Sequence, residues 1–203
     1  MDKEVEISRT ELIAKCQEYL NEKLGKADLE AYAQERIMSD SFDWEDDTVS
    51  DIIHQWDNQY MDFPITKKNV QLWIHQLRTD ENLLAEHNLW NVHINRQKEV
   101  CEKYKSAWNP INKKLKIGYG SDLNADPIHG LRHPKEKGTT GWFIWSGEYS
   151  ESDDFYKPIC AEHLLQVRPD LIKYFGLDTG FRFLIDKNGY EDVWFDEKLK
   201  TTK

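Results

Sequence analysis

The chain has 203 residues, of which 39% are hydrophobic and 32% charged, a composition typical of a folded globular protein. Its 37 acidic and 27 basic residues give a net charge of −10, which disfavours direct binding to nucleic acid because phosphate contacts need clustered lysine and arginine. No apolar run approaches the ~20 residues that span a bilayer, and the charged first residues lack the apolar core of a secretory signal. Cys16, Cys101 and Cys160 form no close pair, so we expect a cytoplasmic protein with reduced thiols.

The excess negative charge is concentrated in one stretch of the chain. Between Asp28 and Asp62, eleven carboxylates accompany a single basic residue, Arg36, whereas the remainder has 26 acidic and 26 basic residues. Such a concentration of like charge costs stability and contributes nothing to a core. Two interpretations stay open: a solvated helix face that aids solubility, or a docking surface for a basic partner.

Helical spacing of apolar residues dominates the first half of the chain. Ser8 and Glu11 form a capping-box motif, Asp46 or Asp47 is a suitable cap for the third helix, and Thr79 or Asp80 for the last. The chain is expected to restart at Thr66 after Phe63-Pro64. The spacing predicts helices over about 8–24, 28–38, 47–60, 66–78 and 80–108. Residues 1–108 are therefore expected to form an acidic, all-α helical bundle with short connections.

The pattern changes after Trp108. Glycine and proline interrupt residues 109–140, which we expect to be an irregular connecting segment with one short strand at most. Residues 141–203 then predict a strand at Trp142–Trp145, a helix over Cys160–Phe175 that Pro169 splits, and a hairpin turning at Asn188-Gly189. The expected fold class is α+β: a helical bundle followed by a small strand-helix-hairpin domain.

Four runs in the last part carry a family resemblance. They are GWFIWSGEYSESDDFYKP, AEHL, LIKYFGLDTGFRFLID and GYEDVWFDEKL. In this order they resemble the C-terminal module of bacterial polymorphic-toxin immunity proteins, in the family numbered thirty-three-like, over about Gly138 to Leu199. The resemblance implies a cytoplasmic protein that binds and blocks a cognate toxin domain, without catalytic residues or a cofactor. The helical part lies outside the resemblance.

A toxin-binding surface can be predicted from charge. Many toxins act on nucleic acid and are basic, so a protein that covers such a toxin should be acidic, and charge complementarity raises association rates toward ~10⁸ M⁻¹s⁻¹. Aromatic anchors would supply the affinity. We predict the partner-binding residues Asp40, Phe42, Asp43, Trp44, Glu45, Asp46, Asp47 and Asp51, with Glu148, Asp153 and Asp154 as secondary candidates. The alternative, in which Phe42 and Trp44 fold into the bundle, stays open.

Other chemistry has weaker support. His129 and His133 lack a third ligand in local register, and Cys160 with His163 lacks an orienting third residue, so neither a metal site nor a catalytic pair is expected. Two further functions stay open: a small hydrolase with an Asp/Glu/His site between the two parts, or a non-catalytic adaptor. A symmetric dimer through an aromatic-rich edge is a further alternative.

Aromatic residues alternate in the strand-like runs of the last part. Trp142 and Trp145 lie in the first run, and Trp194 and Phe195 in the last. At this spacing they are expected to pack in the core or at a sheet edge rather than to form a stacking platform for bases.

Overall fold

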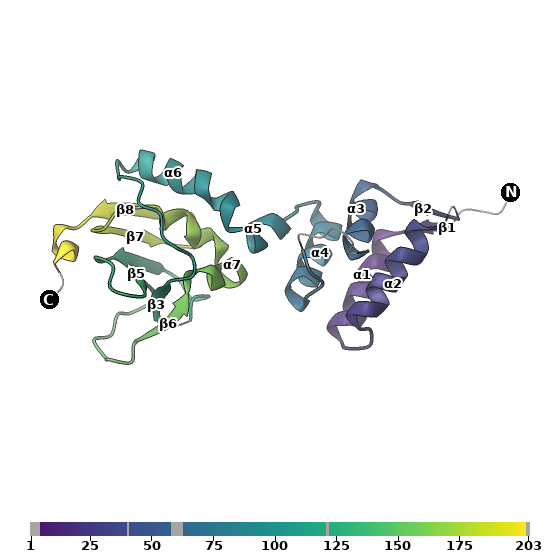
Figure 1. Ribbon diagram of the computed structural model, residues 1–203, viewed down its shortest axis with the longest axis horizontal. Coiled ribbons are helices and arrows are strands. Elements are labelled where there is room, and N and C mark those ends of the chain that lie inside the picture. Colours follow the sequence, from purple (N-terminus) through teal and green to yellow (C-terminus); the bar gives the residue numbers. More distant parts are fainter. Residues whose placement is uncertain (1–4, 40, 58–62, 121, 202–203) are drawn as a thin grey trace. The chain divides into compact units, whose positions relative to one another are not determined.

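A computed structural model describes residues 5–39, 41–57, 63–120 and 122–201 (Figure 1). It confirms the predicted α+β class, with a helical region followed by a six-stranded mixed sheet and short helices. The chain divides into two compact units, unit 1 over Met1–Asn88 and unit 2 over Leu89–Lys203. Within the described ranges, no helix is long and apolar enough to cross a membrane.

The described part of unit 1 contains five α-helices. They are α1 (Arg9–Leu20), α2 (Lys26–Ile37), α3 (Asp47–Trp56), α4 (Lys67–Thr79) and α5 (Leu84–Asn88). The predicted caps Ser8 and Asp46 are confirmed, and Thr66, where the chain was expected to restart, caps α4: each side chain accepts a hydrogen bond from the backbone N–H three residues later. The cap predicted at Thr79 or Asp80 is wrong, because Asp80 ends α4 as its C-cap, with a φ of +63°. The capping box at Ser8 is only half formed, because Glu11 instead accepts a hydrogen bond from the Tyr32 hydroxyl at 2.5 Å. The predicted end of the third helix at Tyr60 lies outside the described residues.

The core of unit 1 forms around two tryptophans. The Trp56 and Trp73 rings meet edge to face with centroids 6.2 Å apart, and both side chains are fully buried. Trp73 Nε1 donates to Gln55 Oε1 at 2.6 Å. The apolar residues of α3 recur at helical spacing, so one face of this helix is buried while the other remains in solvent.

A small parallel sheet in unit 1 was not predicted. Strand β1 (Val5–Ile7) pairs with strand β2 (Phe42–Trp44), with Glu6 opposite Asp43 and Ile7 opposite Trp44. The predicted helices over 28–38 and 47–60 leave these β2 residues in a loop. A three-residue strand has too short an alternation to be recognised without its partner, which lies 37 positions earlier in the chain.

Unit 2 is built on a mixed sheet with strand order β6-β3-β5-β4-β7-β8, in which β3 and β5 are parallel and the other neighbours antiparallel. The strands are β3 (Lys116–Gly120), β4 (Ile128–Arg132), β5 (Thr139–Ser146), β6 (Tyr156–Cys160), β7 (Phe181–Ile185) and β8 (Glu191–Phe195).

The prediction that residues 109–140 are irregular is wrong, because this segment contributes β3 and β4. The glycines of this segment were interpreted as signs of turns. Gly118, Gly120 and Gly130 lie inside strands, where a neighbouring aromatic ring occupies the space of the absent Cβ. Glycine in these strands therefore marks the close approach of a ring rather than a turn. The predicted strand at Trp142–Trp145 and the hairpin at Asn188-Gly189 are confirmed.

Short helices pack against one face of this sheet (Figure 1). They are η1 (Trp90–Val92), α6 (His93–Lys103), η2 (Ala161–His163), α7 (Leu164–Val167) and η3 (Pro169–Tyr174). A further short helix, η4 (Glu197–Lys200), follows β8, and its Leu199 carbonyl lies 3.1 Å from His133 Nδ1. The single helix predicted over 80–108 is wrong: α5 ends at Asn88, and α6 packs in the core of unit 2. The break at Pro169 is confirmed. Gln97 is a polar residue buried on the inner face of α6, and its Nε2 donates to the Ile172 carbonyl at 3.1 Å.

The two faces of the sheet differ in what covers them. Trp142 and Ile144 of β5 and Phe183 of β7 point to the core with the helices. Side chains on the two strands alternate, so Phe143, Trp145 and Arg182 lie on the opposite face. A pocket lies on that second face.

Candidate functional site

Exposed carboxylates line one edge of unit 1, which we call the acidic edge and define as Glu6, Asp43, Glu45, Asp47 and Asp51. The parallel register places Glu6 of β1 beside Asp43 of β2. Asp47 and Asp51 follow at the start of α3, one helical turn apart on its exposed face. The edge therefore brings together four of the predicted binding residues and adds Glu6, which the sequence analysis missed. Asp40 lies outside the described residues.

The two predicted aromatic anchors are turned inward. Phe42 and Trp44 are half-buried and pack against the core of unit 1. The Arg36 guanidinium lies 5.0 Å from the centre of the Phe42 ring, and Trp44 meets the His54 ring edge to face at 6.1 Å. The alternation of β2 causes this arrangement, because it places the aromatics on one side and Asp43 on the other. Of the two interpretations left open for these aromatics, the structure supports folding into the bundle.

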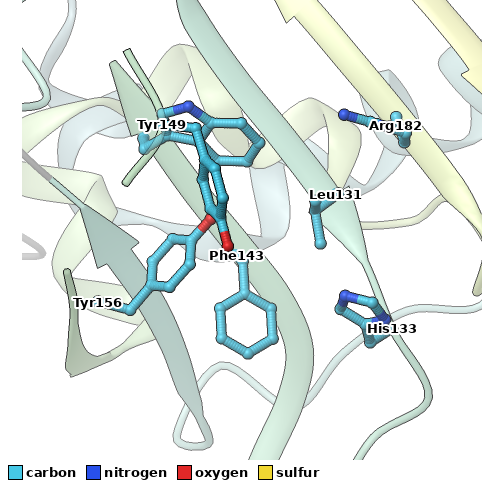
Figure 2. A pocket seen from close by; sticks show the side chains of 7 residues that line it. Leu131, His133, Phe143, Tyr149, Tyr156 and Arg182 are labelled. Carbon is cyan, nitrogen blue, oxygen red and sulfur yellow. The ribbon is translucent and has the colours of Figure 1, made fainter. Parts of the chain in front are cut away.

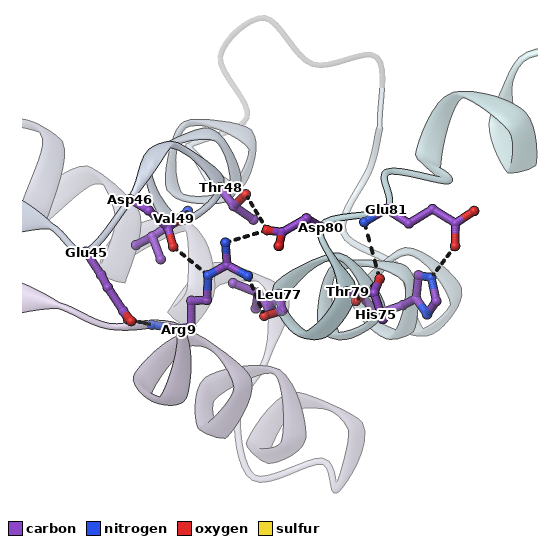
Figure 3. A network of polar contacts seen from close by, with 10 residues as sticks. All are labelled: Arg9, Glu45, Asp46, Thr48, Val49, His75, Leu77, Thr79, Asp80 and Glu81. Atoms are coloured by element: carbon purple, nitrogen blue, oxygen red, sulfur yellow. Dashed lines mark hydrogen bonds and ion pairs between the residues drawn. The ribbon is translucent and has the colours of Figure 1, made fainter.

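Asp46 has a structural role that sets it apart from its neighbours (Figure 3). Its Oδ1 accepts the Val49 N–H at 2.9 Å, which caps α3, and its Oδ2 pairs with Arg9 Nε at 2.5 Å. Burial opposes ionisation of this carboxyl, but the hydrogen bonds from Arg9 and from backbone amides outweigh it and lower its pKa. The same guanidinium binds Asp80 and donates to the Leu77 carbonyl at 3.0 Å, so Arg9 links α1, α3 and the end of α4.

Basic residues of unit 1 do not balance the acidic edge. Unit 1 has 20 acidic and 9 basic residues, whereas unit 2 has 17 and 18. Among the residues placed by the structure, Asp46 is the only predicted binding residue that forms an ion pair; Glu45 accepts the Arg9 backbone N–H at 2.6 Å. The five carboxylates of the acidic edge are thus exposed charges of one sign on neighbouring elements.

A second surface feature is the aromatic pocket on the open face of the unit 2 sheet (Figure 2). Its volume is about 390 Å³. Seven side chains line it: Leu131, His133, Phe143, Trp145, Tyr149, Tyr156 and Arg182. In Figure 2 the aromatic side chains Phe143, Tyr149 and Tyr156 lie on one side, with Leu131, His133 and Arg182 on the other.

Ring packing positions the aromatic wall of the pocket. Trp145 contacts Tyr149 and Tyr156 at centroid distances of 5.8 and 6.2 Å, and Tyr156 contacts Phe143 at 4.9 Å. These rings fit because β3 has no side chain at Gly118 and Gly120: an added Cβ would lie 2.5 Å from the Phe143 ring and 2.8 Å from the Phe155 ring. The Gly-Tyr-Gly sequence of β3 thus opens the face of the sheet on which the aromatic residues gather.

An acidic loop borders the pocket. Residues 148–154 connect β5 to β6 and carry Tyr149 together with four exposed carboxylates: Glu148, Glu151, Asp153 and Asp154. A hydrogen bond from the Ser152 hydroxyl lowers the pKa of Asp154. The secondary binding candidates Glu148, Asp153 and Asp154 therefore lie in the loop that supplies one wall of the pocket.

The two histidines considered as a metal pair have other contacts. His129 stacks on Trp145, and His133 Nδ1 lies 3.1 Å from the Leu199 carbonyl. Burial, with a smaller effect of Arg182, lowers the pKa of His129. In the portion of the chain that the structure describes, no group of three His, Cys, Asp or Glu side chains could hold a metal ion.

Most pocket residues were missed by the sequence analysis because they come from separate strands. Trp145 was recognised as a strand residue, but its face could not be assigned. The sequence does contain a local signal for these residues. Phe143 and Trp145 are two positions apart, as are Gly118 and Gly120, which is the spacing of residues on one face of a strand. Only the pairing of β3 with β5 places the two patterns on one face.

Comparison with known proteins links unit 2 to one family. Residues 96–196 match the family model of the Imm33-like domain. The match extends from α6 into the residue after β8 and includes every residue that lines the aromatic pocket. The earlier resemblance began at Gly138 and thus omitted α6, β3 and β4. No curated protein and no solved structure matches the chain.

Proposed function

Residues 96–196 form an Imm33-like domain, and from that premise we propose that this protein covers a basic toxin domain in the cytoplasm. The family implies an immunity protein that neutralises a cognate toxin, and immunity proteins typically act by binding rather than by catalysis. The finer proposal concerns the charge of the toxin and the way it is blocked. Occlusion requires an exposed surface on this chain that complements the toxin.

The observation that carries the proposal is the placement of Glu6 beside Asp43. Both side chains are exposed, and adjacent like charges on paired strands destabilise the free protein. Glu45, Asp47 and Asp51 extend the same negative surface. A positively charged partner would relieve this repulsion on binding, and its attraction would speed the encounter.

Speed of association has a clear use for an immunity protein. A cell must neutralise its own toxin before damage accumulates, and electrostatic steering raises association rates from the about 10⁵–10⁶ M⁻¹s⁻¹ of neutral surfaces toward ~10⁸ M⁻¹s⁻¹. Charges at the rim of an interface contribute little to affinity, however. Because Phe42 and Trp44 pack inward, a second surface has to provide the apolar contacts that hold the complex.

Co-expression tests the proposed function directly. We expect the full chain to rescue host cells that express the toxin domain encoded by the neighbouring gene, and to co-purify with that domain. A toxin of unrelated family, expressed at the same level, is the specificity control and should remain toxic. Failure to rescue from the cognate domain, with both proteins present in soluble form, would refute the proposal.

The contribution of charge needs a separate test that leaves the fold intact. Changing Trp44 or Asp46 would be a poor test, because Trp44 packs on the core and Asp46 caps α3. Asp47 and Asp51 are better choices since both are exposed. Glu99 and Glu102 on α6 form a matched pair of exposed carboxylates on the helical side of unit 2.

A further inference from the structure

The aromatic pocket has the composition and surroundings of a site for a cation. We propose that the pocket and the loop 148–154 together hold an arginine side chain of the toxin. This inference rests on the proposed function and names the contact that anchors the basic partner. It assigns the affinity to unit 2, where the family match lies.

Aromatic rings provide the first part of the argument. Trp145, Tyr149 and Tyr156 contact one another at centroid distances between 5.8 and 6.5 Å, with interplanar angles from 47° to 81°. Rings set at such angles present faces and edges in several directions around the cavity. A cation within about 6 Å of an aromatic face is attracted by the negative face of the ring. Trp145 is stacked on His129 and only 5% exposed, whereas Tyr149 is 58% exposed, so Tyr149 offers the accessible face.

Charge selects the occupant. Between Ser146 and Pro158 the chain carries four carboxylates and one basic residue, Lys157. The loop carboxylates are exposed and border the cavity through Tyr149. An uncharged apolar side chain would gain nothing from these carboxylates, and an anionic one would be repelled by them. The surroundings therefore complement a positive charge.

Cationic groups at the pocket do not reverse this balance. Arg182 Nη1 lies 3.1 Å from Asp196 Oδ2, and the guanidinium lies 5.3 Å from the centre of the Trp194 ring, so this charge is paired toward β8. His129 stacks on Trp145, and burial lowers its pKa, which keeps the ring neutral at pH 7. His133 contacts the Leu199 carbonyl through Nδ1.

Geometry favours arginine over lysine. A guanidinium is planar, so it can stack on a ring while its edge donates hydrogen bonds to a carboxylate or hydroxyl oxygen. The hydroxyl groups of Tyr149 and Tyr156 converge above the Phe143 ring in Figure 2. Neither hydroxyl has a hydrogen-bond partner within the residues that the structure places, so both oxygens can accept from a guanidinium.

Peptide titration of the full chain tests recognition of the cation. The probes are acetyl-Gly-Arg-Gly-amide, its isosteric citrulline counterpart, which is uncharged, and the corresponding lysine and glutamate peptides. Binding is followed by the shift of the Trp145 indole NMR signal. We expect the arginine peptide to bind at least tenfold more tightly than the citrulline peptide, and also more tightly than the lysine peptide. Equal binding of arginine and citrulline, binding of the glutamate peptide alone, or no shift with any probe would overturn the inference.

Tyr149 allows a matched test with the toxin. Its side chain is 58% exposed, whereas Tyr190 in the β7–β8 turn is 52% exposed and lies outside the pocket lining. We expect Tyr149→Ala to weaken toxin binding at least tenfold, and Tyr149→Phe, which keeps the ring and loses only the hydroxyl, to weaken it less. Tyr190→Ala should stay within threefold of the wild type. Circular dichroism of each variant confirms folding. Wild-type affinity of a folded Tyr149→Ala variant would refute the pocket as the anchor.

The loop provides an independent variant that leaves every ring in place. Glu151→Gln combined with Asp153→Asn removes two of the four loop charges, and we expect about threefold to tenfold weaker toxin binding. One combination of results would reject this inference and leave the proposed function standing. In it, the wild-type chain rescues the host, and both the loop variant and Tyr149→Ala bind the toxin as tightly as the wild type. Absence of rescue by the wild type would reject the proposed function, while the peptide titration would still report on the pocket.

Discussion

The His129 imidazole lies flat against the Trp145 indole, with centroids 4.9 Å apart and planes within 8° of parallel. The two residues face each other across β4 and β5. The stack covers one side of Trp145, so its side chain is only 5% exposed although it lies on the open face of the sheet. This contact holds the tryptophan in place as part of the pocket wall.

The stack predicts a pH dependence of stability in unit 2. Burial of His129 and the nearby Arg182 lower its pKa below the usual 6.5. As pH falls below about 6.5, the unfolded chain therefore takes up this proton more readily than the folded chain, and stability decreases. We expect His129→Phe, which keeps an aromatic partner, to reduce the loss of stability between pH 7.5 and 5.5, measured by hydrogen exchange of β4 and β5 amides. His163→Gln, at an exposed histidine, should behave as the wild type; an unchanged slope in His129→Phe would contradict the prediction.

Asp46 should matter more for stability than for binding. Asp46→Ala removes the cap of α3 and the partner of Arg9. Loss of an N-cap costs about 0.5–2 kcal/mol. We expect a decrease of this size in the free energy of opening of α3, measured by hydrogen exchange. Asp51→Ala, an exposed position on the same helix, is the control and should change that free energy by less than about 0.5 kcal/mol.

Glu191 should stabilise unit 2 in a pH-dependent way. It binds Lys103 Nζ at 2.6 Å and Lys173 Nζ at 2.9 Å, and the Tyr174 hydroxyl donates to it at 2.5 Å. Burial raises the pKa of this carboxyl, but these hydrogen bonds outweigh burial and lower it to about 2. Its contribution is therefore complete above the usual value of 4.5 and is lost as pH falls toward 2.

Urea unfolding of Glu191→Gln checks this prediction. We expect a loss of about 1–3 kcal/mol at pH 7, because a carboxylate that accepts several charged hydrogen bonds is replaced by a neutral amide. Asp192→Asn changes the exposed neighbouring carboxylate and should have little effect. Wild type and Glu191→Gln should converge in stability as pH falls below 4. A constant difference down to pH 2.5 would show that charge is not the cause.

Gly120 should be intolerant of a side chain. An added Cβ would lie 2.8 Å from the Phe155 ring, so Gly120→Ala should cost about 1–3 kcal/mol in unfolding free energy through overpacking. Truncating the ring removes the clash, so the double variant Gly120→Ala/Phe155→Ala should be less destabilised than the sum of the two single changes. Strict additivity in urea unfolding would show that the ring does not occupy this space.

Charge reversal at the acidic edge should slow toxin association. We expect Asp47→Lys with Asp51→Lys to lower the association rate constant by about tenfold at low ionic strength, with a much smaller change in dissociation. The difference should shrink as salt screens the field. The matched pair Glu99→Lys with Glu102→Lys changes the net charge by the same amount at another site. In stopped-flow kinetics this pair should lower the association rate constant by less. Equal effects of the two pairs would assign steering to net charge rather than to the acidic edge.

Local signals predicted much of the fold. Capping residues such as Ser8, Asp46 and Thr66 act on backbone groups within three positions, so their role is independent of the rest of the molecule. The same holds for the Asn188-Gly189 turn, where Gly189 adopts a φ of +89°. Strands β3 and β4 were missed because their glycines make room for aromatic rings from segments distant in the chain, and such contacts have no local signature.

The sequence by itself determined the sign and location of the charge, the helix starts and the family of the last part, because composition and short-range pattern suffice for these. Tertiary structure alone decided which residues share a surface. Parallel pairing placed Glu6 beside Asp43 and turned Phe42 and Trp44 inward, and the order of six strands gathered Leu131, Phe143, Trp145, Tyr149 and Tyr156 around one cavity. Strand register assigns each side chain to a face, and register depends on partners distant in the chain.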